Sequence, residues 1–323
     1  MLFTVTAQAE RWPLAEAFVI SRGAKTEAHV VTVSIEGHGI TGRGECVPYA
    51  RYGESVETVL SAIRAWQPQA SRRMLMKTMP PGAARNAIDC ALWDWEAKHS
   101  HSTAARLAGI GALEPVQTCF TISLAAPSEM AEKARRARNL NFLKLKLGGE
   151  GDPERMRAVR KARPDARLVA DANEAWTRDM LEPYLTVAKT EGFELIEQPL
   201  PAAEDEVLAG IAHPVPICAD ESVHGARDLA TLVGRYEAVN IKLDKAGGLT
   251  EALEMAERAS ALGLKIMCGC MVATSLAMAP ALILAQTAEW ADLDGPLLLA
   301  RDRPNGLHIR EGLITPPVRA LWG

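Results

Sequence analysis

Short apolar runs, each closing on a polar or reactive side chain, recur along this sequence at a nearly constant distance. From about residue 115 onward the closing residues are Thr121, Lys146, Asp171, Glu197, Asp220, Lys242, Cys268 and Asp292. Neighbouring ones lie 22 to 26 residues apart, which is the length of one β-strand and one α-helix with short loops. Eight such units indicate a parallel (β/α) barrel. An open, doubly wound sheet also alternates strands and helices, but no glycine-rich phosphate-binding turn follows the first strand.

The N-terminal third of the chain has a different pattern. A strand-like run at residues 28–34 and a glycine-rich stretch precede a helical segment at 83–100, whose apolar residues recur at helical intervals. We interpret this part as a small α+β unit. The predicted fold class is therefore α/β. We expect a (β/α)7β TIM-like barrel over residues 113–299 and an α+β capping domain over residues 1–112, to which the C-terminal segment 300–323 returns.

Composition bears on partners and location. The chain has 323 residues, with 36 Lys plus Arg against 40 Asp plus Glu and a formal net charge of −4. Nothing in this balance favours binding to nucleic acid or to an anionic membrane. No apolar run reaches the length of a membrane span, and the first residues lack the pattern of a signal peptide. We expect a cytoplasmic protein, and most of its six cysteines, which show no zinc-like spacing, should be reduced core residues.

Three successive strand ends carry carboxylates: Asp171, Glu197 and Asp220. The C-terminal ends of neighbouring barrel strands lie close together, so these anions should converge and would repel one another without a cation between them. Carboxylate oxygens completed by water and substrate suit octahedral Mg²⁺, and no His or Cys shares the cluster to favour zinc. A single carboxylate at a strand end could be a loop cap, but three in a row predict a magnesium site.

Two further strand ends carry lysines. Lys144 and Lys146 point to the same face because side chains alternate along a strand, and a buried lysine needs a partner or a task. Lys146 would lie on the second strand and Lys242 on the sixth, on opposite sides of an eight-stranded barrel. The alternative is that these lysines only form inert ion pairs with the carboxylates. Lys245, just past the sixth strand, is interpreted as a solvated loop charge.

The eighth predicted strand ends in a pair of aspartates. Alternation aims Asp292 and Asp294 to one side, and the eighth strand faces the fourth, which carries Glu197. A bound substrate would then meet a cation at its carboxylate end and two anions at its other end, as a zwitterion requires. The alternative for this pair is capping of the helix that follows the strand.

These motifs together resemble the enolase superfamily, in its muconate-lactonizing subgroup. The resemblance runs through the whole chain and rests on GECVPYARYGES, PGAARNAIDCALWD, the Lys-x-Lys strand, DANE, EQPLP, ICADES, VNIKLDKAGGLTEA and ADLDGP. The last motif is similar to the Asp-x-Asp signature of dipeptide epimerases. Members of this superfamily use a Lys or His base with Mg²⁺.

The resemblance implies a role for each matching residue. One Mg²⁺ per subunit would be held by Asp171, Glu197 and Asp220. Lys146 and Lys242 would be the acid/base catalysts, each with a pKa lowered by the metal and by neighbouring cations. The substrate-binding residues implied are Arg22 for the distal carboxylate of a Glu side chain, Thr121, Lys144 as an accessory to Lys146, Cys270 and Val272 through their backbone, and Asp292 and Asp294 for the ammonium. Cys270 stands where some relatives have serine.

The activity implied is epimerisation of dipeptides such as L-Ala-D-Glu and L-Ala-L-Glu. Protons would be exchanged by two bases at the α-carbon of the second residue, in the recycling of murein peptides. The expected partner is this small-molecule dipeptide, and a homo-oligomer stays open. The alternatives are other activities of the subgroup, namely N-acylamino acid racemase, o-succinylbenzoate synthase and cycloisomerase, because they share the metal and lysine set. A more distant alternative is a non-enzymatic metal-binding or interaction protein on a retained barrel.

Overall fold

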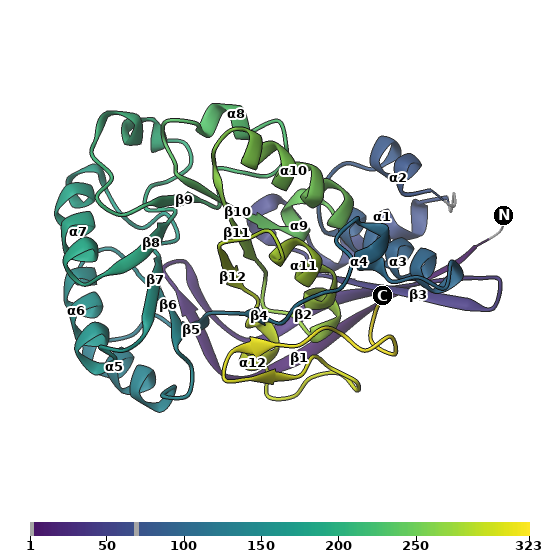
Figure 1. Ribbon diagram of the computed structural model, residues 1–323, viewed down its shortest axis with the longest axis horizontal. Coiled ribbons are helices and arrows are strands. Elements are labelled where there is room, and N and C mark those ends of the chain that lie inside the picture. The colour runs from purple at the N-terminus through teal and green to yellow at the C-terminus, as the bar shows by residue number, and fades with distance from the viewer. Residues whose placement is uncertain (1–2, 68–70) are drawn as a thin grey trace.

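The computed structural model describes residues 3–67 and 71–323. Its main element is an eight-stranded parallel sheet whose strands pair in chain order. These strands are β5 (Phe120–Ile122), β6 (Phe142–Lys146), β7 (Arg167–Asp171), β8 (Phe193–Glu197), β9 (Ile217–Ala219), β10 (Ala238–Lys242), β11 (Lys265–Gly269) and β12 (Trp290–Asp292). The backbone N–H of Cys119 donates to the carbonyl of Ala291 over 2.9 Å, so the two edge strands meet. The predicted barrel is confirmed (Figure 1).

Helices surround the barrel and connect its strands. They are α5 (Pro127–Arg136), α6 (Asp152–Ala162), α7 (Arg178–Thr190), η2 (Asp205–Gly210), α8 (Leu229–Leu232), α9 (Leu243–Ala246), α10 (Leu249–Ala261), α11 (Ser275–Ala285) and α12 (Gly295–Leu298). In the part of the chain that the structure describes, no helix combines the length and apolar character of a membrane span.

Toward the N-terminal ends of the strands, the barrel interior is filled by apolar side chains. Each strand contributes one of them, and for β5 it is the residue just before the strand. This plug consists of Cys119, Phe142, Val169, Leu195, Cys218, Ala238, Met267 and Trp290. The residues next to them on the strands, such as Leu143 and Leu168, point to the other face and belong to the larger core that includes the helices. The strands are therefore buried on both faces, as parallel strands in α/β proteins are.

A separate antiparallel sheet precedes the barrel. It contains β1 (Thr4–Ile20), β2 (Gly23–Gly37) and β3 (Ile40–Cys46), followed by η1 (Ala50–Tyr52), α1 (Val56–Ala65), α2 (Arg72–Thr78), α3 (Ala83–His99) and α4 (Ala104–Leu107). Strand β2 contains the predicted run 28–34, and α3 matches the predicted helix. A Cβ on Gly44 would lie 2.1 Å from the carbonyl oxygen of Ala87, so glycine allows β3 to pack directly on α3. We call residues 3–109 the cap.

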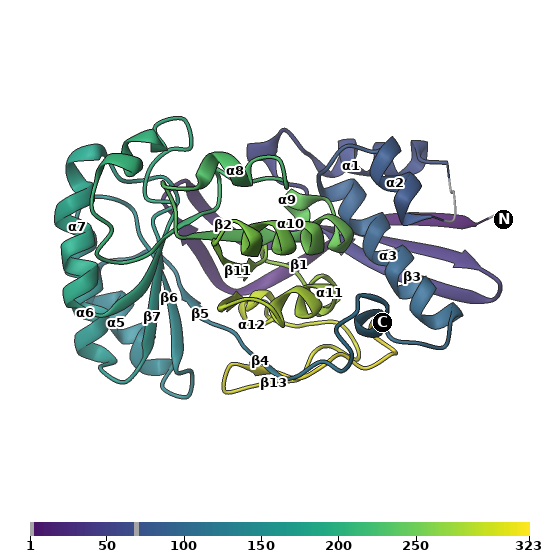
Figure 2. The same ribbon diagram turned by 45° about the horizontal axis from the view of Figure 1, so that its top comes forward.

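The cap and the barrel are joined at several places. The long β1–β2 hairpin extends from the cap across to the barrel, behind α10 and α11 in the view of Figure 2, and Leu124 N–H donates to Val19 O over 3.0 Å. After α12 the chain forms a hairpin of β13 (Ile309–Arg310) and β14 (Leu313–Ile314), and β14 pairs with β4 (Val116–Gln117). The chain ends against α3, where the Trp322 indole donates to Cys90 O over 3.0 Å.

Candidate active site

Alternation along the strands places a layer of mostly polar residues next to the apolar plug, toward the C-terminal ends of the strands. Two positions after each plug residue, and therefore on the same inner face, stand Thr121, Lys144, Asp171, Glu197, Asp220, Asn240, Gly269 and Asp292. The space at this height is full, since a Cβ on Gly269 would lie 2.3 Å from Asn240 Oδ1. Glycine leaves room there for the amide of Asn240, which donates to Glu197 Oε1 over 2.7 Å.

Three carboxylates form the centre of this layer. One oxygen from each of Asp171, Glu197 and Asp220 lies within 4.8 Å of the others, and all three side chains are buried. Burial and the charge of Asp171 raise the pKa of Glu197 to about 7. Burial alone would raise the pKa of Asp171 as well, but Lys146 and Lys144 lower it to about 2. The predicted triad is thus brought together, with the oxygen-only donor set that hard divalent cations prefer.

The two predicted catalytic lysines flank this triad. Lys146 Nζ lies 2.6 Å from Asp171 Oδ2, and Lys242 Nζ lies 2.7 Å from Asp220 Oδ2. They come from β6 and β10, the second and sixth barrel strands. Burial alone would lower the pKa of Lys242, but Asp220 and Glu197 raise it well above its ordinary value. Carboxylates thus contact both ammonium groups directly, and the lowering of the lysine pKa values by a bound metal stays a prediction.

Lys144 connects the triad with the far side of the barrel. Its side chain is buried, and its Nζ lies 2.5 Å from Glu197 Oε2, 2.6 Å from Asp292 Oδ2 and 3.4 Å from Asp171 Oδ2. Burial alone would lower the pKa of Lys144, but Asp292 and Glu197 raise it well above its ordinary value. The ammonium group of Lys144 thus lies between Asp292 on the eighth strand and the carboxylates on the third and fourth strands.

Lys245 was wrongly interpreted as a solvated loop charge. It is buried, and its Nζ lies 2.5 Å from both Asp220 Oδ1 and the Asp220 carbonyl oxygen. The short helix α9 turns the chain back immediately after β10, which carries Lys245 onto the neighbouring strand end. Burial alone would raise the pKa of Asp220, but Lys242 and Lys245 hold it well below its ordinary value.

Asp292, which ends the eighth strand, and Asp294, two residues further on, are both buried. Asp294 Oδ2 accepts from the backbone N–H of Thr121 over 2.7 Å, and its side chain caps no N–H of α12. The helix-capping alternative is therefore wrong for Asp294. Burial and the charge of Asp292 raise the pKa of Asp294 to about 7. Asp292 is paired with Lys144 and accepts from the Cys119 thiol over 3.2 Å.

Arg22 reaches the site from the turn between β1 and β2. Its guanidinium donates to Glu221 Oε1 and to the carbonyl oxygen of Asn173, each over 2.7 Å, and lies 3.3 Å from Glu174 Oε2. Glu221 follows the triad residue Asp220, so Arg22 stands at the edge of the carboxylate cluster. The sequence analysis did not include Glu221. Its position directly after the predicted metal ligand Asp220 could have indicated that it lies near the site.

The segment between β11 and α11 forms another wall of the site. Cys270 and Val272 are half-buried, whereas Cys268 is buried within β11. Cys270 is thus the one described cysteine that is not buried, and the other five are core thiols as expected.

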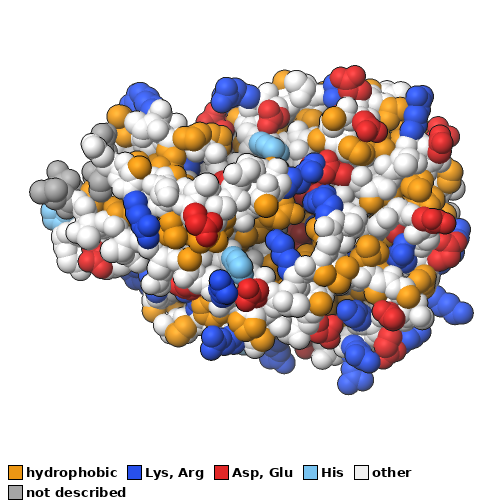
Figure 3. Space-filling view, turned by 180° about the vertical axis from the view of Figure 1, so that it is seen from behind, with side chains coloured by type: hydrophobic (Ala, Val, Ile, Leu, Met, Phe, Trp, Pro, Cys, Tyr) orange, Lys and Arg blue, Asp and Glu red, His pale blue; other side chains and the backbone are white. Residues whose placement is uncertain are grey.

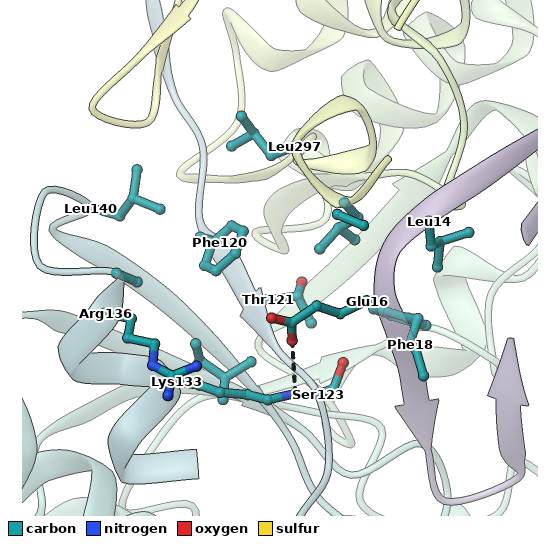
Figure 4. A pocket seen from close by; sticks show the side chains of 15 residues that line it. Leu14, Glu16, Phe18, Phe120, Thr121, Ser123, Lys133, Arg136, Leu140 and Leu297 are labelled. Atoms are coloured by element: carbon teal, nitrogen blue, oxygen red, sulfur yellow. Dashed lines mark ion pairs between the residues drawn. The ribbon is translucent and has the colours of Figure 1, made fainter. Parts of the chain in front are cut away.

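A cavity of about 350 Å³ lies beside this site, and neither the triad nor the two lysines line it (Figure 4). Its walls are mainly apolar and include Leu14, Phe18, Phe120 and Leu297. Phe120 lies next to Thr121 on β5 and so points away from the barrel interior. The hollow near the middle of the face opposite to that in Figure 1 has acidic side chains in its depth and Lys and Arg side chains at its rim (Figure 3).

Comparison with known families identifies the chain. Residues 2–109 match the model for the mandelate racemase / muconate lactonizing enzyme N-terminal domain, and residues 128–320 match the enolase C-terminal domain-like model. The chain belongs to the enolase superfamily, in the mandelate racemase / muconate lactonizing enzyme family. It is an isomerase, as its curated relatives, which are epimerases and racemases, also are.

Two curated relatives cover nearly the whole chain. It is 47% identical to the L-Ala-D/L-Glu epimerase of Escherichia coli K12, over 96% of this chain and 98% of that one. It is 43% identical to an N-acetyl-D-glutamate racemase of a Pseudoalteromonas species, over 91% of this chain and 95% of that one.

Two solved structures are also similar. An enolase family member from Agrobacterium tumefaciens with homology to dipeptide epimerases, with bound sodium and L-Ala-L-Glu, has a TM-score of 0.98 and 52% identity over 100% of both chains. A dipeptide epimerase from Enterococcus faecalis V583, complexed with Mg and L-Leu-L-Tyr, has a TM-score of 0.89 and 30% identity, covering 97% of this chain and 96% of that one.

Proposed function

We propose that this protein is a Mg²⁺-dependent dipeptide epimerase that inverts the α-carbon of the second residue of L-Ala-D-Glu and L-Ala-L-Glu. The observation that carries this proposal is the placement of two lysines on opposite strands around one carboxylate triad. Lys146 lies 2.6 Å from Asp171, and Lys242 lies 2.7 Å from Asp220. A substrate carbon above the triad would have one amine on each face, which is the arrangement that inversion needs.

The triad fits the metal by its chemistry. Asp171, Glu197 and Asp220 offer only carboxylate oxygens, buried and within 4.8 Å of one another, and Mg²⁺ prefers such ligands. When bound there, Mg²⁺ supplies positive charge beside the substrate carboxylate, which makes the neighbouring C–H more acidic. The relative from Enterococcus faecalis contains Mg and a dipeptide, which supports the same assignment here.

The lysines would perform the proton transfers. One amine must be neutral to take the α-proton from one face, and the other must be charged to donate a proton to the opposite face. In the reverse direction Lys146 and Lys242 exchange these roles. Lys144, 2.5 Å from Glu197 and 2.6 Å from Asp292, would act as an accessory to Lys146, since both amines lie beside Asp171 Oδ2.

Substrate preference would be set around the barrel mouth. Asp292 and Asp294 would hold the free α-ammonium of the first residue, with Thr121 fixing Asp294 through its N–H. The backbone of Cys270 and Val272 would contact the peptide. Arg22 would leave Glu221 to bind the side-chain carboxylate of a glutamate, because an arginine fork pairs well with a carboxylate.

A second candidate is racemisation of N-acylated glutamate. The relative with 43% identity is an N-acetyl-D-glutamate racemase, and the same triad and lysines would serve that reaction. An acetyl group has no ammonium, however, so two buried carboxylates at Asp292 and Asp294 would gain no charge partner from it. This feature favours the dipeptide.

Proton NMR in D₂O separates these functions. The enzyme with MgCl₂ is incubated with L-Ala-D-Glu, L-Ala-L-Glu, other Ala-Xaa dipeptides and N-acetylglutamate. The proposal predicts loss of the α-proton signal of the second residue and appearance of the other epimer with the two Ala-Glu dipeptides. Turnover of N-acetylglutamate alone would establish the second candidate instead, and turnover of neither would refute both.

The proposal extends to the biological setting. Epimerisation of an L-Ala-D-Glu peptide suits recycling of murein fragments in the cytoplasm, with the dipeptide as partner and with no nucleic acid or membrane involved. We also propose the division into a capping domain at 1–112, with segment 300–323, and a catalytic barrel at 113–299. A deletion strain that accumulates L-Ala-D-Glu would support the recycling role.

A further inference from the structure

A partly buried ionic cluster joins the cap to the loops that follow the last two barrel strands. Arg303, in the segment after α12, lies 2.5 Å from Glu45 Oε2 and 2.7 Å from Glu10 Oε2. Its guanidinium also lies over the ring of Trp12, 4.9 Å from the centroid. Glu45 is the penultimate residue of β3, and its side chain is fully buried. Two cap carboxylates thus hold one barrel-side cation, and none of these residues belongs to the reactive centre.

Glu45 also binds the start of α11. Its Oε1 accepts from the backbone N–H of Thr274 over 2.8 Å, and its Oε2 accepts from the Thr274 hydroxyl over 2.6 Å. Arg303 Nε donates to the same hydroxyl oxygen over 2.7 Å. Strand β11 ends at Gly269, so residues 270–273 are held between a strand end and a doubly anchored threonine. Cys270 and Val272 lie within this segment.

The loop that carries Asp294 packs on segment 270–273, which the cluster anchors. The next residue, Gly295, packs so closely on the first loop that a Cβ there would lie 2.8 Å from the carbonyl oxygen of Ala273. Beyond it, Ala300 N–H donates to Pro13 O in β1 over 2.9 Å. The two loops therefore contact each other and the cap, and a shift of Thr274 would move both.

We propose that Glu45 and Arg303 are positioning residues for substrate recognition. They hold segment 270–273, and through it the Asp294 loop, in the geometry that receives the peptide backbone and the ammonium. This inference rests on the proposed function, since it assigns the purpose of these loops. The cluster should affect substrate binding and not the proton transfers, because none of its atoms contacts the triad or the two lysines.

The test compares Glu45→Gln with a matched control, Asp89→Asn. Asp89 is also a buried cap carboxylate, and it likewise accepts from the N–H and the hydroxyl of a threonine, Thr250, over 2.9 and 2.7 Å. Thr250 lies in α10, away from the substrate loops. We expect Glu45→Gln to raise KM for L-Ala-L-Glu roughly 10- to 100-fold, the effect of a misplaced contact. Its kcat and its Kd for Mg²⁺ should change little, and Asp89→Asn should keep the wild-type KM.

If Glu45→Gln does not fold, two milder variants at Thr274 test the same contact. Thr274→Val removes the hydroxyl and should raise KM, whereas Thr274→Ser keeps both donors and should behave as wild type. A wild-type KM in Glu45→Gln or in Thr274→Val would overturn the inference, as would an equal rise in Asp89→Asn. Lack of dipeptide turnover by the wild-type enzyme would instead refute the proposed function, and the inference with it.

Discussion

Asp89 offers a test of how strongly burial acts on a carboxylate between the cap and the barrel. The side chain is 0% exposed, and it lies on α3 against the start of α10. Burial raises its pKa from 3.8 to about 6, although two hydrogen bonds from Thr250 and the charges of Arg72 and Arg85 oppose the rise. The folded protein therefore keeps this group protonated at pH values where the unfolded chain has lost the proton.

The sign and the size of the effect follow from this shift. Between about pH 4 and pH 6 the folded state binds more protons at Asp89 than the unfolded state does, so the contribution of this group to stability falls as pH rises. A difference of roughly two pKa units corresponds to about 3 kcal/mol of unfolding free energy. The contribution is complete below pH 4 and is lost above pH 6.

The variant Asp89→Asn isolates this contribution. Asparagine keeps one carbonyl acceptor for Thr250 and does not titrate, so the difference in unfolding free energy between variant and wild type should rise by about 3 kcal/mol from pH 4 to pH 7. Urea unfolding followed by fluorescence at pH 4, 5, 6 and 7 measures this difference, in which other titrating groups cancel. Parallel stability curves for the two proteins would refute the reasoning.

Three further predictions concern the site. Removal of divalent ions with EDTA should abolish epimerisation and lower Tm. Added Mg²⁺ should restore both, because it binds the triad only in the folded protein. Equal Tm and activity without metal would contradict this prediction. Asp294→Asn keeps the acceptor for Thr121 but loses its charge, so KM for Ala-Xaa dipeptides should rise about tenfold while any turnover of N-acetylglutamate is unchanged; an unchanged dipeptide KM would point to another ammonium site. Arg22→Gln should raise KM for L-Ala-L-Glu about tenfold but not for L-Ala-L-Leu, and an equal effect on both would exclude a contact with the glutamate carboxylate.

The barrel and its triad were predictable because they depend on local periodicity. Each strand and its helix repeat over 22 to 26 residues, and alternation within a strand fixes which residues face inward. Asp171 and Glu197 do end their strands, and Asp220 follows β9 by one position. The Asp-x-Asp pair was found for the same reason, although only the structure shows that Asp294 binds Thr121 rather than its own helix.

Contacts between distant segments were not predictable in this way. Lys245 binds Asp220 because α9 reverses the chain after β10, and no periodic pattern announces such a turn. The cluster of Glu45 and Arg303 joins residues 258 positions apart, so its two charges look like ordinary surface groups in the sequence.

The central claim is that two amines serve opposite faces of one carbon, and single-lysine variants in D₂O test it most directly. Lys146→Ala and Lys242→Ala should each lose interconversion of L-Ala-D-Glu and L-Ala-L-Glu by roughly 10²- to 10⁴-fold. Each variant should still exchange the α-proton of one epimer, and the two variants should exchange different epimers. Interconversion at the wild-type rate in either variant, or exchange of the same epimer by both, would contradict the account.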